Sequence, residues 1–141
     1  MSLSLLIALF STASLGKSEP VFRTKQQLQI IQEGETHYGY ELREIVTKRG
    51  TQYLLSNMIY GRENRRRFVT PKYYAQVRRE LEDLAKNYPI RRPQHRCEPE
   101  YQITITRPGG LGQAGQFCLT MLSEKRRAKA RNLIRDLESQ F

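Results

Sequence analysis

Two segments of the chain carry apolar residues at the three- and four-residue spacing of an amphipathic helix. Thr70 and Pro71 are typical of the start of the first, because a threonine hydroxyl caps the first turn and proline there lacks only an N–H that would have no partner. We expect this helix to end before Pro89, and its apolar face comprises Tyr74, Val77, Leu81, Leu84 and Tyr88. The second helix is expected to begin at Ser123–Glu124, with an apolar face of Ala130, Leu133, Ile134, Leu137 and Phe141.

Alternating apolar and polar positions predict strands before the first helix. The stretch 21–32 is polar and moderately β-prone, so we expect a first strand near its end. The residues from Tyr38 to Leu42 alternate, and the shift of the apolar phase at Ile45 suggests a β-bulge. A turn at Lys48-Arg49-Gly50 then leads into a strand over 51–60, with Gly50 free to adopt a positive φ.

The segment from Gly61 to Arg67 is polar and basic, and we expect a flexible connection, to which Phe68-Val69 could add a short strand not counted in the order below. After the helix, Tyr101, Ile103 and Ile105 alternate as a half-buried strand. Its expected partner is Phe117, Leu119 and Met121, reached through a hairpin loop from Arg107 to Gln116.

The order of these elements predicts an α+β fold. Two hairpin units in the order β-β-β-α-β-β-α would form one small antiparallel sheet, with both amphipathic helices packed on one face. The length of 141 residues suits one domain. No stretch reaches the roughly 18 apolar residues of a membrane-spanning helix, so we expect no transmembrane segment in the mature chain.

Residues 1–16 carry no charge and include an apolar run, Leu3 to Phe10, followed by small residues. This pattern is typical of a signal peptide, although a positively charged start is missing. We expect cleavage after Ala13 or Gly16, which would leave a single domain over 17–141 in a secreted or periplasmic protein. The alternative is a retained and buried N-terminal segment.

Cys97 and Cys118 are the only cysteines, and an exported chain favours a disulfide between them. Two alternatives remain. The first is a metal site formed with His37 and His95, whose spacing fits no compact zinc module. The second is a pair of ordinary free thiols in a cytosolic protein.

The residues from Gly110 to Gly115 match the G-x-G-x-x-G pattern, but a strand and not a helix is expected to follow. A dinucleotide site needs the helix N-terminus beside the pyrophosphate, so a hairpin loop is the better interpretation. The sequence has no recognisable catalytic motif, and Glu98 and Glu100 are expected to be solvated. We therefore expect a non-enzymatic protein without a cofactor.

The chain has 24 Lys and Arg against 14 Asp and Glu, a net charge of +10. Arginine suits bidentate contact with phosphate or carboxylate, so an anionic macromolecule or an acidic protein is the expected partner. A further basic group lies in the proline-rich segment 91–96. The candidate polyanion-binding residues are Arg62, Arg65, Arg66, Arg67, Arg127, Arg131 and Arg135.

Three hypotheses follow for the function. The first is a secreted or periplasmic binding module for an anionic partner. The second is a structural or inhibitor-like interaction domain that presents the loop from Arg107 to Gln116. The third is a cytosolic nucleic-acid-binding protein, which requires the N-terminal segment to be retained.

Overall fold

A computed structural model describes residues 23–34, 36–89, 100–110 and 112–141. The expected signal peptide at 1–16, the basic segment 91–96, His95 and Cys97 lie outside the described residues. The elements are β1 (Arg23–Glu33), β2 (Tyr38–Thr47), β3 (Gly50–Ile59), β4 (Arg62–Val69), α1 (Pro71–Asn87), β5 (Glu100–Thr106), β6 (Gln113–Cys118), the 3₁₀ turn η2 (Leu119–Met121) and α2 (Glu124–Ser139).

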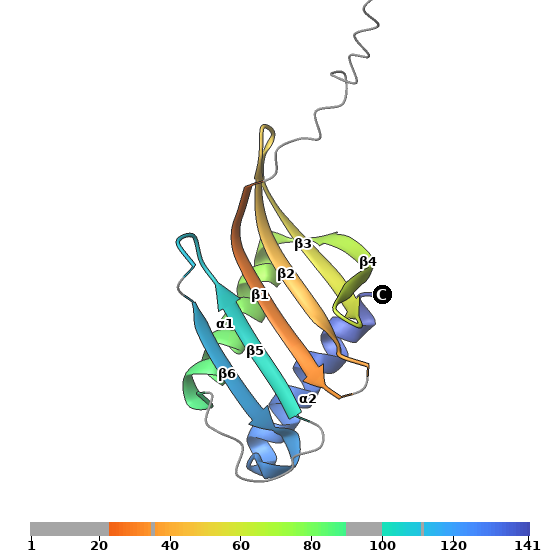
Figure 1. The fold of residues 1–141 in the computed structure, drawn as a ribbon, viewed down its shortest axis with the longest axis vertical. Coiled ribbons are helices and arrows are strands. Elements are labelled where there is room, and N and C mark those ends of the chain that lie inside the picture. Colours follow the sequence, from red (N-terminus) through yellow and green to blue (C-terminus); the bar gives the residue numbers. More distant parts are fainter. Residues whose placement is uncertain (1–22, 35, 90–99, 111) are drawn as a thin grey trace, which may run out of the picture.

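The six strands form one antiparallel sheet in the order β4-β3-β2-β1-β5-β6. Both helices lie on the same face, behind the sheet in Figure 1. The predicted α+β class is confirmed. The predicted order is wrong in one respect, because four strands and not three precede α1.

The start of α1 follows from its capping residue. Thr70 accepts a hydrogen bond from the backbone N–H of Tyr73, and Pro71 begins α1 as predicted. Between the helices and the sheet lies one continuous apolar core. Its fully buried residues include Leu28, Ile30, Leu42, Leu55, Val77, Leu81, Ile103, Ile105 and Leu137.

The segment predicted as a flexible connection, Gly61 to Arg67, is instead most of strand β4. Tyr60 and Gly61 have φ values of 52° and 71°, the positive pair of a type I′ hairpin turn, so the chain reverses there and pairs with β3. Every residue from Arg62 to Phe68 is exposed. Backbone pairing with β3 therefore forms this edge strand. Its sequence lacks the alternation of buried and exposed residues by which the other strands can be predicted.

The second hairpin also differs from the prediction. β5 ends at Thr106 and β6 runs from Gln113 to Cys118, so the connection is shorter than predicted, while Leu119–Met121 forms η2 and not strand. Gly115 lies inside β6 on the helix-covered face, where a Cβ atom would lie only 2.6 Å from Ala85 Cα. One glycine of the G-x-G-x-x-G pattern therefore lets α1 pack directly on the strand backbone.

The predicted β-bulge lies in the partner strand. The register between β1 and β2 shifts from Thr24↔Ile45 to Gln26↔Glu44, which leaves Lys25 as the extra residue in β1. The apolar phase changes at Ile45 because its side chain turns to the other face of the sheet.

That other face, which we call the open face, is covered by no helix or strand of the described chain. Polar side chains bury one another there. The Glu41 carboxylate accepts hydrogen bonds of 2.7 and 2.6 Å from the amides of Gln27 and Gln29. Arg43 lies 3.1 Å from Glu41 through Nε and 3.1 Å from Glu63 through Nη2.

Candidate anion-binding surface

Most of the β4 arginines predicted to bind a polyanion have partners within the protein. Arg67 donates a hydrogen bond of 2.6 Å to the Gln140 carbonyl at the end of α2, and Arg65 makes a longer one of 3.5 Å to the Phe141 carbonyl. Carbonyls at a helix C-terminus attract cations, so these contacts secure α2 against the edge strand. On the open face, Arg66 Nε lies 3.4 Å from the Glu63 carboxylate.

The arginines of α2 divide in the same way. Arg127, half-buried, donates to three carbonyls, at 3.1 Å to Leu119, 2.8 Å to Thr120 and 3.0 Å to Leu122. It therefore holds η2 against the start of α2. Arg131, which lies farther along the same helix, is exposed.

Arg62, Arg131 and Arg135 are exposed, and no hydrogen bond or ion pair involves them within the described part of the chain. The structure does not gather the predicted arginines into one patch. Arg127 and Gln140, which Arg67 contacts, are separated by 13 positions of helical chain, or about 20 Å.

A denser group of cations lies at the end of the sheet where the β2–β3 hairpin turns. We call it the basic end, and its residues are Arg23, Lys25, Lys48 and Arg49. Arg23 pairs with Val46 in the β1–β2 register, which places the start of β1 beside the hairpin turn. All four side chains are exposed. Figure 1 shows this hairpin extending beyond the neighbouring strand ends.

The basic end has little compensating negative charge. In the described segments 23–26 and 44–52, the only carboxylate is that of Glu44, which is buried. Lys25 Nζ lies 3.6 Å from it. Arg23, Lys48 and Arg49 face no carboxylate within ion-pair distance in the described residues. Sequence reasoning missed this group because only the strand register brings Arg23 next to a turn 25 residues later.

Hydrogen bonds link residues of the hairpin turn to one another and tie the base of the hairpin region to α1. In the turn, Thr47 Oγ1 donates to the Gly50 carbonyl at 3.0 Å and accepts from the Arg49 N–H at 3.1 Å. At the base, the Tyr74 hydroxyl of α1 donates to Gln26 at 3.2 Å. Burial, and then the charge of Glu44, raises the pKa of Tyr74, which keeps this hydroxyl protonated as a donor.

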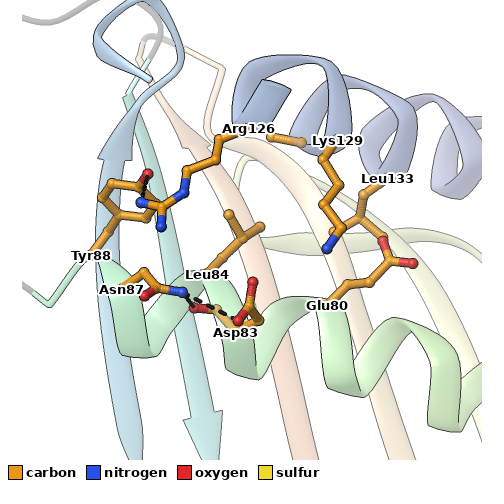
Figure 2. Close-up of a pocket in the computed structure, with 9 residues that line it drawn as sticks. Glu80, Asp83, Leu84, Asn87, Tyr88, Arg126, Lys129 and Leu133 are labelled. Carbon is orange, nitrogen blue, oxygen red and sulfur yellow. Dashed lines mark hydrogen bonds between the residues drawn. The ribbon is translucent and has the colours of Figure 1, made fainter. Parts of the chain in front are cut away.

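A hollow of about 30 Å³, the interhelical groove, lies between α1 and α2 (Figure 2). Arg126 donates a hydrogen bond of 2.7 Å to the Tyr88 hydroxyl, and its guanidinium lies 5.5 Å from the centre of that ring. Lys129 lines the groove opposite Glu80 and Asp83. Because basic side chains of α2 meet acidic side chains of α1, this groove presents no excess of positive charge.

The remaining predicted site residues are only partly described. Cys118 is half-buried at the end of β6, and its expected disulfide partner Cys97 lies outside the described residues, so the bridge stays a prediction. The same holds for the alternative metal site, which needs His95. His37 Nδ1 lies 3.5 Å from the Glu33 carboxylate. Glu100 accepts a hydrogen bond from Gln116.

Comparisons with family models, with curated proteins and with solved structures gave no match. The surface is therefore interpreted from its own geometry. Among the described residues, neither helix has the length and apolar character needed to cross a membrane.

Proposed function

We propose that the protein is a non-enzymatic binding module for an anionic macromolecule, which it contacts first through the basic end. One observation carries this proposal. Two separate strand segments place four exposed cations at one projecting end of the sheet, against a single buried carboxylate in the described segments 23–26 and 44–52. We also propose that the module acts outside the cytoplasm, after removal of the N-terminal segment 1–16.

Physical chemistry favours a polymer with regularly spaced phosphates or sulfates. Each cation that neutralises such a charge releases a condensed counterion, so several modest contacts add up to useful affinity at low salt. Arg23 and Arg49 can form bidentate contacts with such groups, while the lysines act as point charges. The exposed Arg131 and Arg135 add to the long-range attraction that steers the partner.

The test compares two double variants that remove equal charge. Lys48→Gln/Arg49→Gln removes two cations of the basic end, and Arg131→Gln/Arg135→Gln removes two cations of α2. A single-stranded DNA oligonucleotide serves as the probe, and its dissociation constant is measured by fluorescence anisotropy over a series of salt concentrations. We expect the hairpin variant to flatten the log–log salt slope by about 1.4, which corresponds to two lost contacts at about 0.7 each.

The α2 variant should change that slope by less than half as much. Equal effects of the two variants would remove the basic end as the primary contact. Binding of the unaltered protein that ignores salt would remove the polyanion function itself and favour the inhibitor-like interaction domain. Arg67 is unsuitable for such a test, because its substitution also releases the Gln140 carbonyl of α2.

A further inference from the structure

At the opposite end of the sheet from the basic end, a cavity of about 190 Å³ opens between the strands and α2. Three aromatic rings, an amide, a carboxylate and an isoleucine contribute most of its lining: Tyr38, Tyr40, Tyr101, Gln32, Glu138 and Ile134. A cavity of about 150 Å³ holds benzene, so this one has room for a compact group of about six to eight non-hydrogen atoms.

The tyrosine hydroxyls of this cavity already have partners within the protein. The hydroxyls of Tyr38 and Tyr40 share a hydrogen bond of 2.9 Å, and Tyr38 also accepts one of 2.9 Å from the Asn57 amide. The Tyr101 hydroxyl donates to Gln32 at 3.4 Å. A ligand recognised through many hydroxyl groups, such as a sugar, would have to compete with these bonds. The partly exposed ring of Tyr38 is the main aromatic surface that remains, since Tyr40 and Tyr101 are only 2% and 8% exposed.

The ring arrangement suits a compact, rounded group. The planes of Tyr38 and Tyr40 meet at 82° with their centres 5.5 Å apart, so the two rings form a corner. Tyr101 stacks on Phe117 at 5.3 Å with an interplanar angle of 17°, and Tyr40 stacks on Phe141 at 6.3 Å with an angle of 16°, so one face of each of these two rings is covered within the protein. The negative face of each ring attracts a cation that lies within about 6 Å.

Glu138 is the only charged residue in the lining, and no cation pairs with its carboxylate in the described part of the chain. Burial is the main cause that raises the pKa of Tyr40, and a hydrogen bond with Tyr38 and the charge of Glu138 add to it. Burial also raises the pKa of Tyr101, against a smaller opposing effect of Arg131. With both phenols neutral, the carboxylate is the only charge of the cavity lining.

We propose that this cavity binds an organic ammonium group, with its alkyl substituents against the tyrosine rings and its positive charge facing Glu138. The inference is independent of the polyanion function. The cavity and the basic end lie at opposite ends of β1, about 30 Å apart at 3.3 Å per residue.

The experiment titrates the full chain with choline and follows tyrosine ring resonances by two-dimensional NMR. The matched control ligand is the neutral carbon isostere of choline, in which a tert-butyl group replaces the trimethylammonium group. We expect saturable shifts at Tyr38, Tyr40 and Tyr101, and a dissociation constant at least about tenfold lower for choline than for the isostere.

Two substitutions on α2 complete the test. Glu138→Gln keeps the size of the side chain and removes the charge of this exposed residue, so choline affinity should fall by about twofold to fivefold. Glu124→Gln, in the first turn of the same helix and away from the cavity, should leave it unchanged. Equal affinity for the two ligands, equal effects of the two variants, or the absence of saturable shifts from a folded protein would overturn the proposal.

Discussion

The two faces of the sheet reach similar burial by different means. On the helix-covered face, leucines and isoleucines from both helices and four strands exclude water from one apolar core. On the open face, Leu54 is 5% exposed, Glu41 8% and Ser56 0%, although no helix covers them in the described chain. Among the described residues, cross-strand neighbours surround this polar network, and its charges are paired with one another.

The polar network on the open face also attaches the edge strand β4 to the rest of the sheet. Arg43 bridges Glu41 and Glu63, and the Glu63 carboxylate accepts a hydrogen bond of 2.7 Å from Ser56. Glu63 belongs to β4, which has little apolar surface of its own. The chain of ion pairs therefore attaches the edge strand to the centre of the sheet, as Arg67 does on the covered face.

The largest expected effect lies on the covered face. Leu81→Ala should lower the free energy of unfolding by about 2–5 kcal/mol, because the leucine is fully buried at the centre of the α1 apolar face and leaves a cavity. Urea denaturation followed by circular dichroism measures the change. Arg79→Ala, exposed on the same helix, should stay within about 0.5 kcal/mol. A reversed order of the two effects would show that α1 presents a different side to the sheet.

Two neighbouring residues of β6 test the contrast between the faces directly. Gly115→Ala should destabilise the protein by about 1–3 kcal/mol, because its Cβ would lie 2.6 Å from Ala85 Cα and 2.9 Å from the Tyr88 carbonyl oxygen. Ala114→Ser, exposed on the open face, should be nearly neutral. Thermal unfolding of both variants provides the comparison, and an unchanged melting temperature for Gly115→Ala would contradict the close packing of α1.

The smallest of these effects concerns the open face. Glu41→Gln keeps the shape of the side chain but replaces a charged acceptor with a neutral amide, so we expect a loss of about 1 kcal/mol. Glu124→Gln, at an exposed position, is the matched control. Because Arg43 also contacts Glu63, the loss should grow when measured in a Glu63→Gln background, where Glu41→Gln leaves the guanidinium without a carboxylate partner. Strict additivity would argue against a connected network.

The features that sequence predicted are those in which apolar spacing and burial coincide. Both helices, the start of α1 at Thr70 and the turn before Gly50 follow from local chemistry and are confirmed. Strand β4 could not be predicted because its side chains are exposed, so its sequence shows no alternation of apolar and polar residues. The start of β6 was misplaced because Gly115, an inward-facing position without a side chain, interrupts the apolar pattern, and its end because Leu119 and Met121 continue the alternation into η2.

The candidate sites were harder to predict because register and tertiary contact decide them. By its charge, Arg127 is a candidate for binding a partner. In the structure, its guanidinium donates hydrogen bonds to three backbone carbonyls of the preceding turn. The basic end needs the pairing of Arg23 with Val46, and the tyrosine cavity needs β1, β2, β5 and α2 together. No local pattern encodes either arrangement.

The two outer strands of the sheet have a consequence for the behaviour of the protein at high concentration. Unpaired backbone groups on an outer strand can recruit another strand and start aggregation, and closely spaced like charges oppose this. β4 presents Arg62, Arg65, Arg66 and Arg67, so two copies aligned along it would repel each other. On β6, the chain that follows α1 occupies the outer side, since Gln116 N–H donates to the Tyr88 carbonyl and Pro89 bridges to Gly115. Positive charge thus protects β4 from pairing with the edge of another copy, and the segment that follows α1 protects β6.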